Sequence, residues 1–255
     1  MFMFAELSII SNFTFLTGAS HPEEYMMRAA LLGLPAIAIA DVNSVTGIVR
    51  AYNAARDIKR FVKDRESKDL IGPPRPQNIK KPPSLSLNTI PRLVPGSKLQ
   101  LIDGFEVTVL PKSRKGWGTL CRCLSKGRLR NNKGLCDLVI SEIIEELDEV
   151  VLLIHSPETP WNLKKSKLWL ENSTLLKNRF NQDVYIVLTP EYDGIDPKRF
   201  KNIRKLSKII RCDLVASAHP IMHHSKRRKL ADVLTAIRLG KSVDQLGKNA
   251  LPNAE

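Results

Sequence analysis

The amino-acid sequence predicts a barrel-like α/β fold. Short apolar runs alternate with amphipathic stretches along the 255 residues, and polar residues directly follow several of the runs. Runs that are apolar at consecutive positions are typical of parallel strands covered on both faces. We find no internal repeat of solenoid or propeller length, and no apolar run long enough to span a membrane.

The predicted elements follow in chain order. Each strand is an apolar run bounded by polar or turn-forming residues, and the helices show apolar residues at three- or four-residue spacing. Asp103-Gly104 predicts the turn of a hairpin between two alternating segments. Strands are expected at residues 4–10, 34–40, 150–154, 184–188 and 214–216, the hairpin at 100–110, and helices at 22–32, 44–63, 115–124, 141–147, 198–210 and 228–239.

The helix over residues 22–32 has the clearest boundary signals. Ser20 and Glu23 have the S-x-x-E spacing of a capping box, and Pro22 suits the first turn. Gly33 is expected to end the helix, because glycine readily adopts the left-handed conformation of a C-terminal cap.

Positive charge is in large excess. The chain has 40 Lys and Arg against 26 Asp and Glu, a formal net charge of +14. Residues 112–133 form a basic cluster without an acidic residue, and residues 198–229 form a second one with a single acid, Asp213. Such fields favour polyanionic partners and salt-dependent binding, so we expect weak, non-specific contact with DNA; a solvated basic surface is the alternative.

Nucleotide-binding P-loop, Rossmann and hydrolase-elbow motifs are absent from the sequence. What remains is a set of polar residues at predicted strand ends, and carboxylate and imidazole groups are common metal ligands. Structural roles compete: a helix cap for the aspartate, an ordinary loop histidine, and an exposed histidine-rich loop over 219–224. The candidates are Glu6, Ser8, Asp41, His155, His219, His223 and His224.

Several segments resemble the error-prone DNA polymerases of bacteria, which are of the replicative alpha-subunit type. The most specific segment is NFTFLTGASHPEE at residues 12–24. Residues 29–41, 227–238 and 251–255 are also similar, so the resemblance covers nearly the whole chain. It implies the N-terminal polymerase-and-histidinol-phosphatase (PHP) domain, which is a distorted (β/α)7 barrel.

The resemblance also implies a domain organisation. Residues 1–240 would form the PHP domain, with a proline-rich irregular insertion at about 64–89, and residues 241–255 would begin a linker to a polymerase module. The palm of the polymerase would follow that linker, so we expect an N-terminal fragment. Full-length members are nucleotidyltransferases that use magnesium, whereas this chain is expected to need no cofactor and to be inactive alone.

The metal-binding motifs of the family are largely missing at the matching positions. Isoleucine and valine have no lone pair to donate, and serine is a poor ligand for a transition metal. The unsuitable residues, which stand where the resemblance expects histidines, are Ser8, Ile10, Val42 and Ile221. The candidates that remain are Asp41, His155 and His219, too few for a cluster of two or three ions.

The resemblance implies a structural, non-catalytic PHP domain of an error-prone DNA polymerase, which acts in DNA replication and in damage-induced translesion synthesis in the cytoplasm. The implied partners are DNA, a polymerase module, the sliding clamp and a Y-family-like accessory protein, with no membrane involved. Two alternatives stay open: a metal-dependent phosphoesterase or 3′–5′ exonuclease, and a basic nucleic-acid-binding module. Metal content separates the first of these from the structural role.

Overall fold

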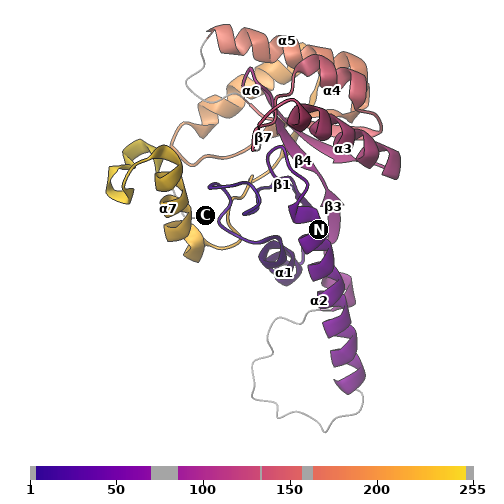
Figure 1. Ribbon diagram of the computed structural model, residues 1–255. Coiled ribbons are helices and arrows are strands. Elements are labelled where there is room, and N and C mark those ends of the chain that lie inside the picture. Colours follow the sequence, from indigo (N-terminus) through magenta and orange to yellow (C-terminus); the bar gives the residue numbers. More distant parts are fainter. Residues whose placement is uncertain (1–3, 70–85, 133, 157–162, 251–255) are drawn as a thin grey trace.

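The computed structural model describes residues 4–69, 86–132, 134–156 and 163–250 of the chain. The strands form two sheets, with helices packed around them (Figure 1). The three-stranded sheet is parallel and has the order β1–β2–β3. The five-stranded sheet has the order β4–β5–β6–β7–β8. The strands are β1 Glu6–Ile9, β2 Ala36–Ile39, β3 Arg92–Pro95, β4 Ser97–Gln100, β5 Glu106–Pro111, β6 Val150–Ile154, β7 Val184–Leu188 and β8 Asp213–Ala216.

The second sheet is mixed. β4 and β5 form the predicted hairpin, and β5 also runs antiparallel to β6, whereas β6, β7 and β8 are parallel. As a consequence, the first residues of β5 lie at the same edge as the carboxyl ends of β4 and β6. This reversal brings residues of the hairpin to the edge where the functional groups of parallel strands gather.

Gly96 alone separates β3 from β4 and so joins the two sheets. A Cβ atom there would lie 2.7 Å from Leu110 Cδ2 and 3.0 Å from the Val109 carbonyl oxygen, so glycine is required. Apolar side chains of both sheets pack into one cluster, which shows that the sheets curve around a common interior. That cluster contains Leu7, Ala38, Val94, Leu110, Val151, Leu153, Tyr185, Val187 and Val215.

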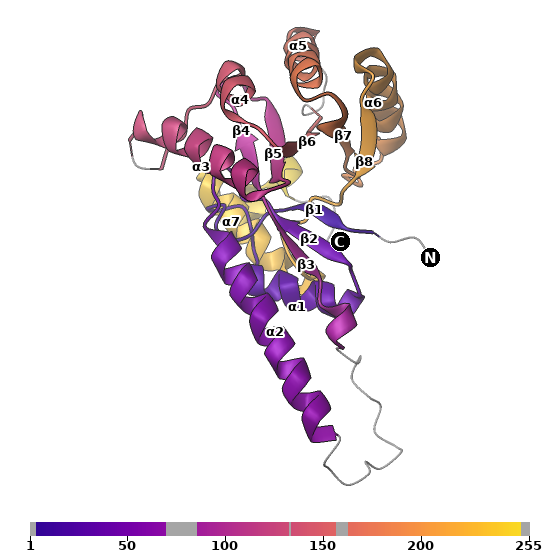
Figure 2. The same ribbon diagram turned by 90° about the vertical axis from the view of Figure 1, so that its right-hand side faces the viewer.

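Helices cover the outer faces of both sheets. α1 and α2 pack on the first sheet, and α2 projects well beyond it (Figure 2). α3 to α6 pack on the second sheet, while α7 packs on the loop after β1 and the segment that follows β8. The helices are α1 Pro22–Leu32, α2 Gly47–Asp69, α3 Arg114–Leu129, α4 Ile140–Glu146, α5 Leu163–Phe180, α6 Asp196–Ile210 and α7 Arg228–Leu239.

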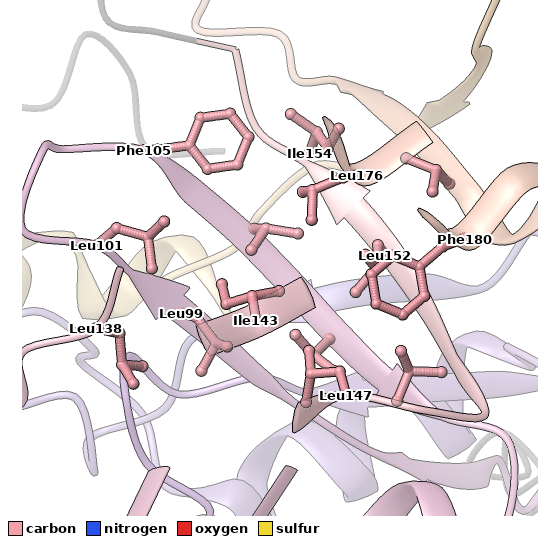
Figure 3. Close-up of a cluster of buried hydrophobic side chains, with 14 of the residues drawn as sticks. Leu99, Leu101, Phe105, Leu138, Ile143, Leu147, Leu152, Ile154, Leu176 and Phe180 are labelled. Carbon is pink, nitrogen blue, oxygen red and sulfur yellow. The ribbon is translucent and has the colours of Figure 1, made fainter. Parts of the chain in front are cut away.

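The largest core lies between the second sheet and its helices. Figure 3 shows Leu99 and Leu152 of the strands gathered with Ile143 of α4 and Phe180 of α5. Leu99, Ile143 and Leu152 have no exposed surface. At about 25 cal/mol for each Å² of apolar surface removed from water, this layer is the main stabilising contribution of the second sheet. Within the described residues, no helix has the length and apolar character needed to cross a bilayer.

Most predicted elements are confirmed. The mixed α/β architecture with a barrel-like arrangement is as expected, although no backbone pairing between β1 and β8 closes the barrel in the described part of the chain. The predicted strands correspond to β1, β2, β6, β7 and β8, the hairpin to β4 and β5, and six of the helices to α1, α2, α3, α4, α6 and α7.

The boundaries of the predicted insertion need correction. α2 begins at Gly47 and continues to Asp69, so residues 64–69 are helical and not irregular. Charged side chains at Arg60, Lys63 and Asp64 suit an exposed helix surface as well as they suit a loop. Leu87–Thr89 forms a short 3-10 helix. Residues 70–85, the proline-rich part of the prediction, lie outside the described residues.

Two elements were not predicted. β3 was missed because it is short and lies between prolines, and α5 because polar residues interrupt its buried face. Asn172 and Ser173 are buried in α5 beside Trp169. The Ser173 hydroxyl donates to the Trp169 carbonyl oxygen at 2.7 Å, which satisfies it inside the helix. This local hydrogen bond makes a polar residue tolerable at a buried helical position.

The N-terminal cap of α1 also differs from the prediction. The capping residue is His21 and not Ser20: the His21 amide donates to Glu24 Oε2 at 2.8 Å. Ser20 instead lies 2.8 Å from His223 Nδ1 and accepts from the His223 amide at 3.0 Å. Ser20 therefore forms hydrogen bonds with the segment after β8 and does not cap α1. Gly33 ends the helix with a φ of 69°, as predicted.

Candidate functional site

A polar cluster lies where the strands of the second sheet end. The pairing of β4 with β5 sets Lys98 opposite Thr108 and Gln100 opposite Glu106. Because side chains alternate along a strand, Lys98, Thr108 and Glu106 share one face of the hairpin. One histidine follows β6 and a second follows β8. We call this group the strand-end cluster: Lys98, Glu106, Thr108, His155 and His219.

Lys98 is the centre of the strand-end cluster. Its ammonium nitrogen lies 2.7 Å from Glu106 Oε2 and 3.3 Å from His219 Nε2. The Lys98 side chain is only 9% exposed, and that of Glu106 is 30% exposed. A buried ammonium ion is costly to desolvate unless a carboxylate and further hydrogen bonds compensate it, as they do here.

His219 joins β8 to β1. Its Nδ1 lies 2.9 Å from the Ser8 carbonyl oxygen, which can only accept, so Nδ1 carries the proton. The Nε2 atom is then free to accept from the ammonium of Lys98. Burial of the ring and the neighbouring charge of Lys98 lower the pKa of His219 to about 3, so the ring is neutral at pH 7. The His219 backbone is left-handed, with a φ of 47°, a strained conformation for a residue with a side chain.

His155 is held by three hydrogen bonds. Its Nε2 lies 2.8 Å from Thr108 Oγ1, its amide donates to the Glu106 carbonyl oxygen at 3.0 Å, and its carbonyl oxygen accepts from Trp169 Nε1 at 2.7 Å. The ring centroid lies 5.0 Å from that of His219. Burial, followed by the charge of Lys98, lowers the pKa of His155 well below its usual value.

Asp41 belongs to a different arrangement. Its carboxylate accepts from the Ser11 amide and the Ser11 hydroxyl, both at 2.8 Å, and from Thr14 Oγ1 at 2.9 Å. Burial raises the pKa of Asp41, while the hydrogen bonds from Ser11 and Thr14 act in the opposite direction. No hydrogen bond of the described residues joins this carboxylate to His155 or His219. The role of Asp41 as a cap for the next helix is also excluded, because α2 begins only at Gly47.

The remaining positions of the sequence prediction have structural roles. Ser8 Oγ lies 2.5 Å from Ser217 Oγ, and Ile10 is buried. Ile221 packs beside α7, and Val42 lines a groove described below.

The expectation of an exposed histidine-rich loop at 219–224 is wrong. His219 belongs to the strand-end cluster, His223 bonds Ser20, and His224 accepts from the Lys226 amide at 3.1 Å. His219 and His223 thus contact residues far away in the chain, whereas the contact of His224 is local.

The donor atoms of the site are already engaged. Both nitrogens of His219, the Nε2 of His155 and both oxygens of Asp41 have hydrogen-bond partners. Among the residues that the structure describes, no three His, Cys, Asp or Glu side chains are arranged to hold a metal ion. The residues present therefore do not fit a cluster of two or three ions, which needs several shared ligands.

Sequence reasoning missed Lys98 and Glu106. The predicted hairpin at 100–110 contained Glu106 but not Lys98; extending it about the turn at Asp103-Gly104 sets both residues on one face. The hydrogen bond between Lys98 and the histidine beyond β8 required the tertiary fold.

The fold and the site define a barrel-like α/β protein with a polar cluster at the carboxyl ends of its parallel strands. Residues 6–194 match the model of the PHP domain. The chain belongs to the PHP domain family.

Curated proteins with similar sequences include error-prone DNA polymerases. The chain is 36% identical over 266 residues to the error-prone DNA polymerase of Ruegeria pomeroyi, an alignment that covers 99% of this chain and 23% of the relative. It is 32% identical over 253 residues to that of Rhodopseudomonas palustris strain BisB5, covering 99% of this chain and 20% of the relative. The chain thus spans about a fifth to a quarter of the length of the curated relatives it matches.

Two solved structures share the fold. One is described as a metal-dependent phosphoesterase from Bifidobacterium adolescentis, with a TM-score of 0.52 and 10% identity over 85% of this chain and 87% of the other. The second is an amidohydrolase from Chromobacterium violaceum with bound sulfate and no metal, with a TM-score of 0.51 and 12% identity over 86% and 87%. At this level of identity the likeness concerns the fold alone.

Proposed function

We propose that this chain is a structural, non-catalytic PHP domain that supports an error-prone DNA polymerase. The family match and the polymerase relatives support the association. The observation that carries the non-catalytic role is the ammonium of Lys98 between Glu106 and His219. It uses the lone pair of His219 and places a positive charge where a divalent cation would be repelled.

The alternative of a metal-dependent phosphoesterase or exonuclease would require this arrangement to open. Lys98 would have to leave His219, and Asp41 would have to leave Ser11 and Thr14, before either could act as a ligand. Each move breaks a buried hydrogen bond to a charged group, which costs about 1.5–3 kcal/mol. The structural role needs no such rearrangement.

Metal content and hydrolysis test the non-catalytic role. The purified chain is incubated with manganese, zinc or magnesium, dialysed, and assayed by elemental analysis and against a phosphomonoester and a 3′-labelled DNA strand. We expect fewer than about one metal per chain and no hydrolysis. Two or more tightly bound metals, together with hydrolysis that Asp41→Asn abolishes, would contradict the proposal.

A chimera tests the support of a polymerase. This chain replaces the matching segment of the Ruegeria pomeroyi error-prone DNA polymerase, and primer extension is compared with that of the parent and of a form lacking the segment. We expect the chimera to retain extension and the deletion to lose it. Equal extension by the chimera and the deletion would show that the chain gives no support.

The wider functional context is also a proposal. We propose DNA as a partner, and a polymerase module as the part that would hold magnesium and perform nucleotidyl transfer. Contacts with the sliding clamp and a Y-family-like accessory protein, a role in damage-induced synthesis, and the cytoplasmic location stay predictions from the sequence resemblance. The chimera can be assayed with these partners once its extension activity is established.

A further inference from the structure

A polar and aromatic groove of about 610 Å³ lies apart from the strand-end cluster. It opens between the loop after β1, the turn after β2, the end of β4 and the segment after α3. Figure 2 shows the start of α2 close to α3, on the side where these segments meet. Its lining includes Phe13, Phe15, Asn43, Gln100, Arg128 and Asp137.

The loop after β1 presents its aromatic side chains on a rigid support. Phe15 is 83% exposed although it is large and apolar. Its neighbour Thr14 is buried, donates to Asp41 and accepts from the Val42 amide at 3.0 Å. Leu16 has a left-handed backbone with a φ of 55°. Asp41 holds the backbone on one side of Phe15, so the loop is already ordered while the ring is exposed to water. A ligand that binds the ring therefore does not incur the entropic cost of ordering a free loop.

Arginines from three helices surround this loop. The Arg128 guanidinium donates to the Asn43 carbonyl oxygen, with Nε at 3.2 Å, and Arg238 Nη1 lies 2.7 Å from Thr17 Oγ1. The Arg50 guanidinium lies 6.0 Å from the centre of the Phe13 ring.

Acidic groups only partly offset these arginines. Arg50 also pairs with Glu23 at 2.5 Å, and Asp137 is the acid that lines the groove. Among the described residues, neither Arg128 nor Arg238 forms an ion pair. Positive charge is therefore in excess around an exposed aromatic ring.

We propose that this groove binds single-stranded nucleic acid, with a base stacked on Phe15 and phosphates near Arg128, Arg50 and Arg238. Exposed aromatic rings beside a basic groove are the features with which proteins bind single strands, whose bases are free to stack. A duplex keeps its bases stacked inside and would use the phosphate contacts alone. The charge favours a polyanion over an ordinary peptide segment.

The inference goes beyond the structural role and is independent of it, because binding can be measured without polymerase or hydrolase activity. It also gives Asp41 a function: the aspartate left at the matching family position holds the aromatic loop. The basic cluster at residues 112–133 contributes Arg128 to this surface, whereas the helix of the second cluster, α6, lies outside the groove.

Fluorescence anisotropy with a labelled oligothymidylate of about 15 nucleotides, and with a duplex of the same length, tests the proposal. We expect tighter binding of the single strand. Phe15→Ala should weaken binding about 5- to 100-fold and Phe15→Trp should restore it, because stacking needs a ring. Tyr192→Ala, which removes an exposed aromatic ring outside the groove, should leave binding unchanged.

Salt dependence locates the phosphate contacts. Arg128→Gln should reduce the slope of log affinity against log salt by about 0.7, the value for one phosphate of a single strand. Lys208→Gln on α6 is the matched charge control and should leave the slope nearly unchanged.

Three results would overturn the proposal. They are equal affinity of Phe15→Ala and the unaltered chain, a larger effect of Lys208→Gln than of Arg128→Gln, and no binding of the oligothymidylate at low salt. The absence of oligothymidylate binding at low salt would favour a protein segment as the ligand of this groove. Thermal unfolding of each variant confirms that the fold is intact.

Discussion

Lys98 connects the side chains at the strand ends of the second sheet. Its ammonium pairs with Glu106 and donates to His219, and after burial its charge is the second cause that lowers the pKa of both His155 and His219. A lysine in a buried strand is rare unless it is paired, and here the pairing comes from the hairpin register and from a segment that follows β8. The residue therefore holds the ends of β4, β5 and the segment after β8 together.

The first prediction concerns pH. The pKa of His219 is lower in the folded chain than in the unfolded chain, so below about pH 6.5 the unfolded chain binds more protons. Stability is therefore complete above about pH 6.5 and falls as the pH falls toward about 3, by at most about 1.4 kcal/mol per pH unit for this group.

Urea unfolding of His219→Gln and of the unaltered chain at about pH 6.5 and about pH 5 measures this effect. The variant should lose part of the pH dependence. His224→Gln removes a histidine outside the strand-end cluster and serves as the control. An unchanged pH dependence in His219→Gln would contradict the assignment.

At the scale of the element, two glycines of α3 differ in their surroundings. Ser113 caps the helix by accepting from the Gly116 amide at 3.1 Å. A Cβ atom at Gly116 would lie 2.3 Å from the Glu149 carbonyl oxygen, whereas at Gly118 the nearest atom would be Arg122 Nη1 at 3.6 Å. The first turn of α3 thus packs directly on the backbone before β6, and Gly118 faces free space.

The second prediction follows from this difference. Gly116→Ala should destabilise the chain by about 1–3 kcal/mol, because the backbone of residue 149 cannot move aside without cost. Gly118→Ala should stabilise it by about 0.5–1 kcal/mol, because alanine is the better helix former. Urea unfolding of both variants gives the comparison within one helix. The same sign for both substitutions would show that helix propensity, and not the contact with residue 149, decides the outcome.

At the scale of the whole molecule, side chains join the first and last strands. The buried carboxylate of Glu6 accepts from Ser217 Oγ at 2.5 Å, from the Ala218 amide at 2.8 Å and from the Ser8 amide at 3.0 Å. The Ile10 amide adds a bond to the Pro220 carbonyl oxygen at 3.0 Å. These contacts connect β1 to β8 where strand pairing does not.

The third prediction is that Glu6→Ala destabilises the chain by about 2–4 kcal/mol, because two buried donors and one partly buried donor lose their acceptor. Amide hydrogen exchange should accelerate at Ala218 and Ile10 before it does so in β5 or β6, since the junction opens first. Glu145→Ala removes an exposed glutamate and should have little effect. Uniform acceleration of exchange across all strands would show that the junction does not open as a separate unit.

The order of most elements follows from local features of the sequence. Apolar runs at 150–154 and 184–188, glycines at the ends of two helices and a turn at Asp103-Gly104 are local signals, because they depend on period and backbone conformation. The sequence also identified Asp41, His155 and His219 as strand-end residues. Sequence similarity to polymerases indicated the PHP domain, which the family match confirmed.

Which of those residues lie in contact depends on the folded chain as a whole. His155 and His219 lie together because β6 and β8 end at one edge, while Asp41 is turned toward Ser11 and Thr14. The partnership of Lys98 with His219, and the grouping of Phe15 with Arg128, join residues more than a hundred positions apart. Such contacts depend on the curvature of two sheets around a shared interior, and no local property of the chain specifies them.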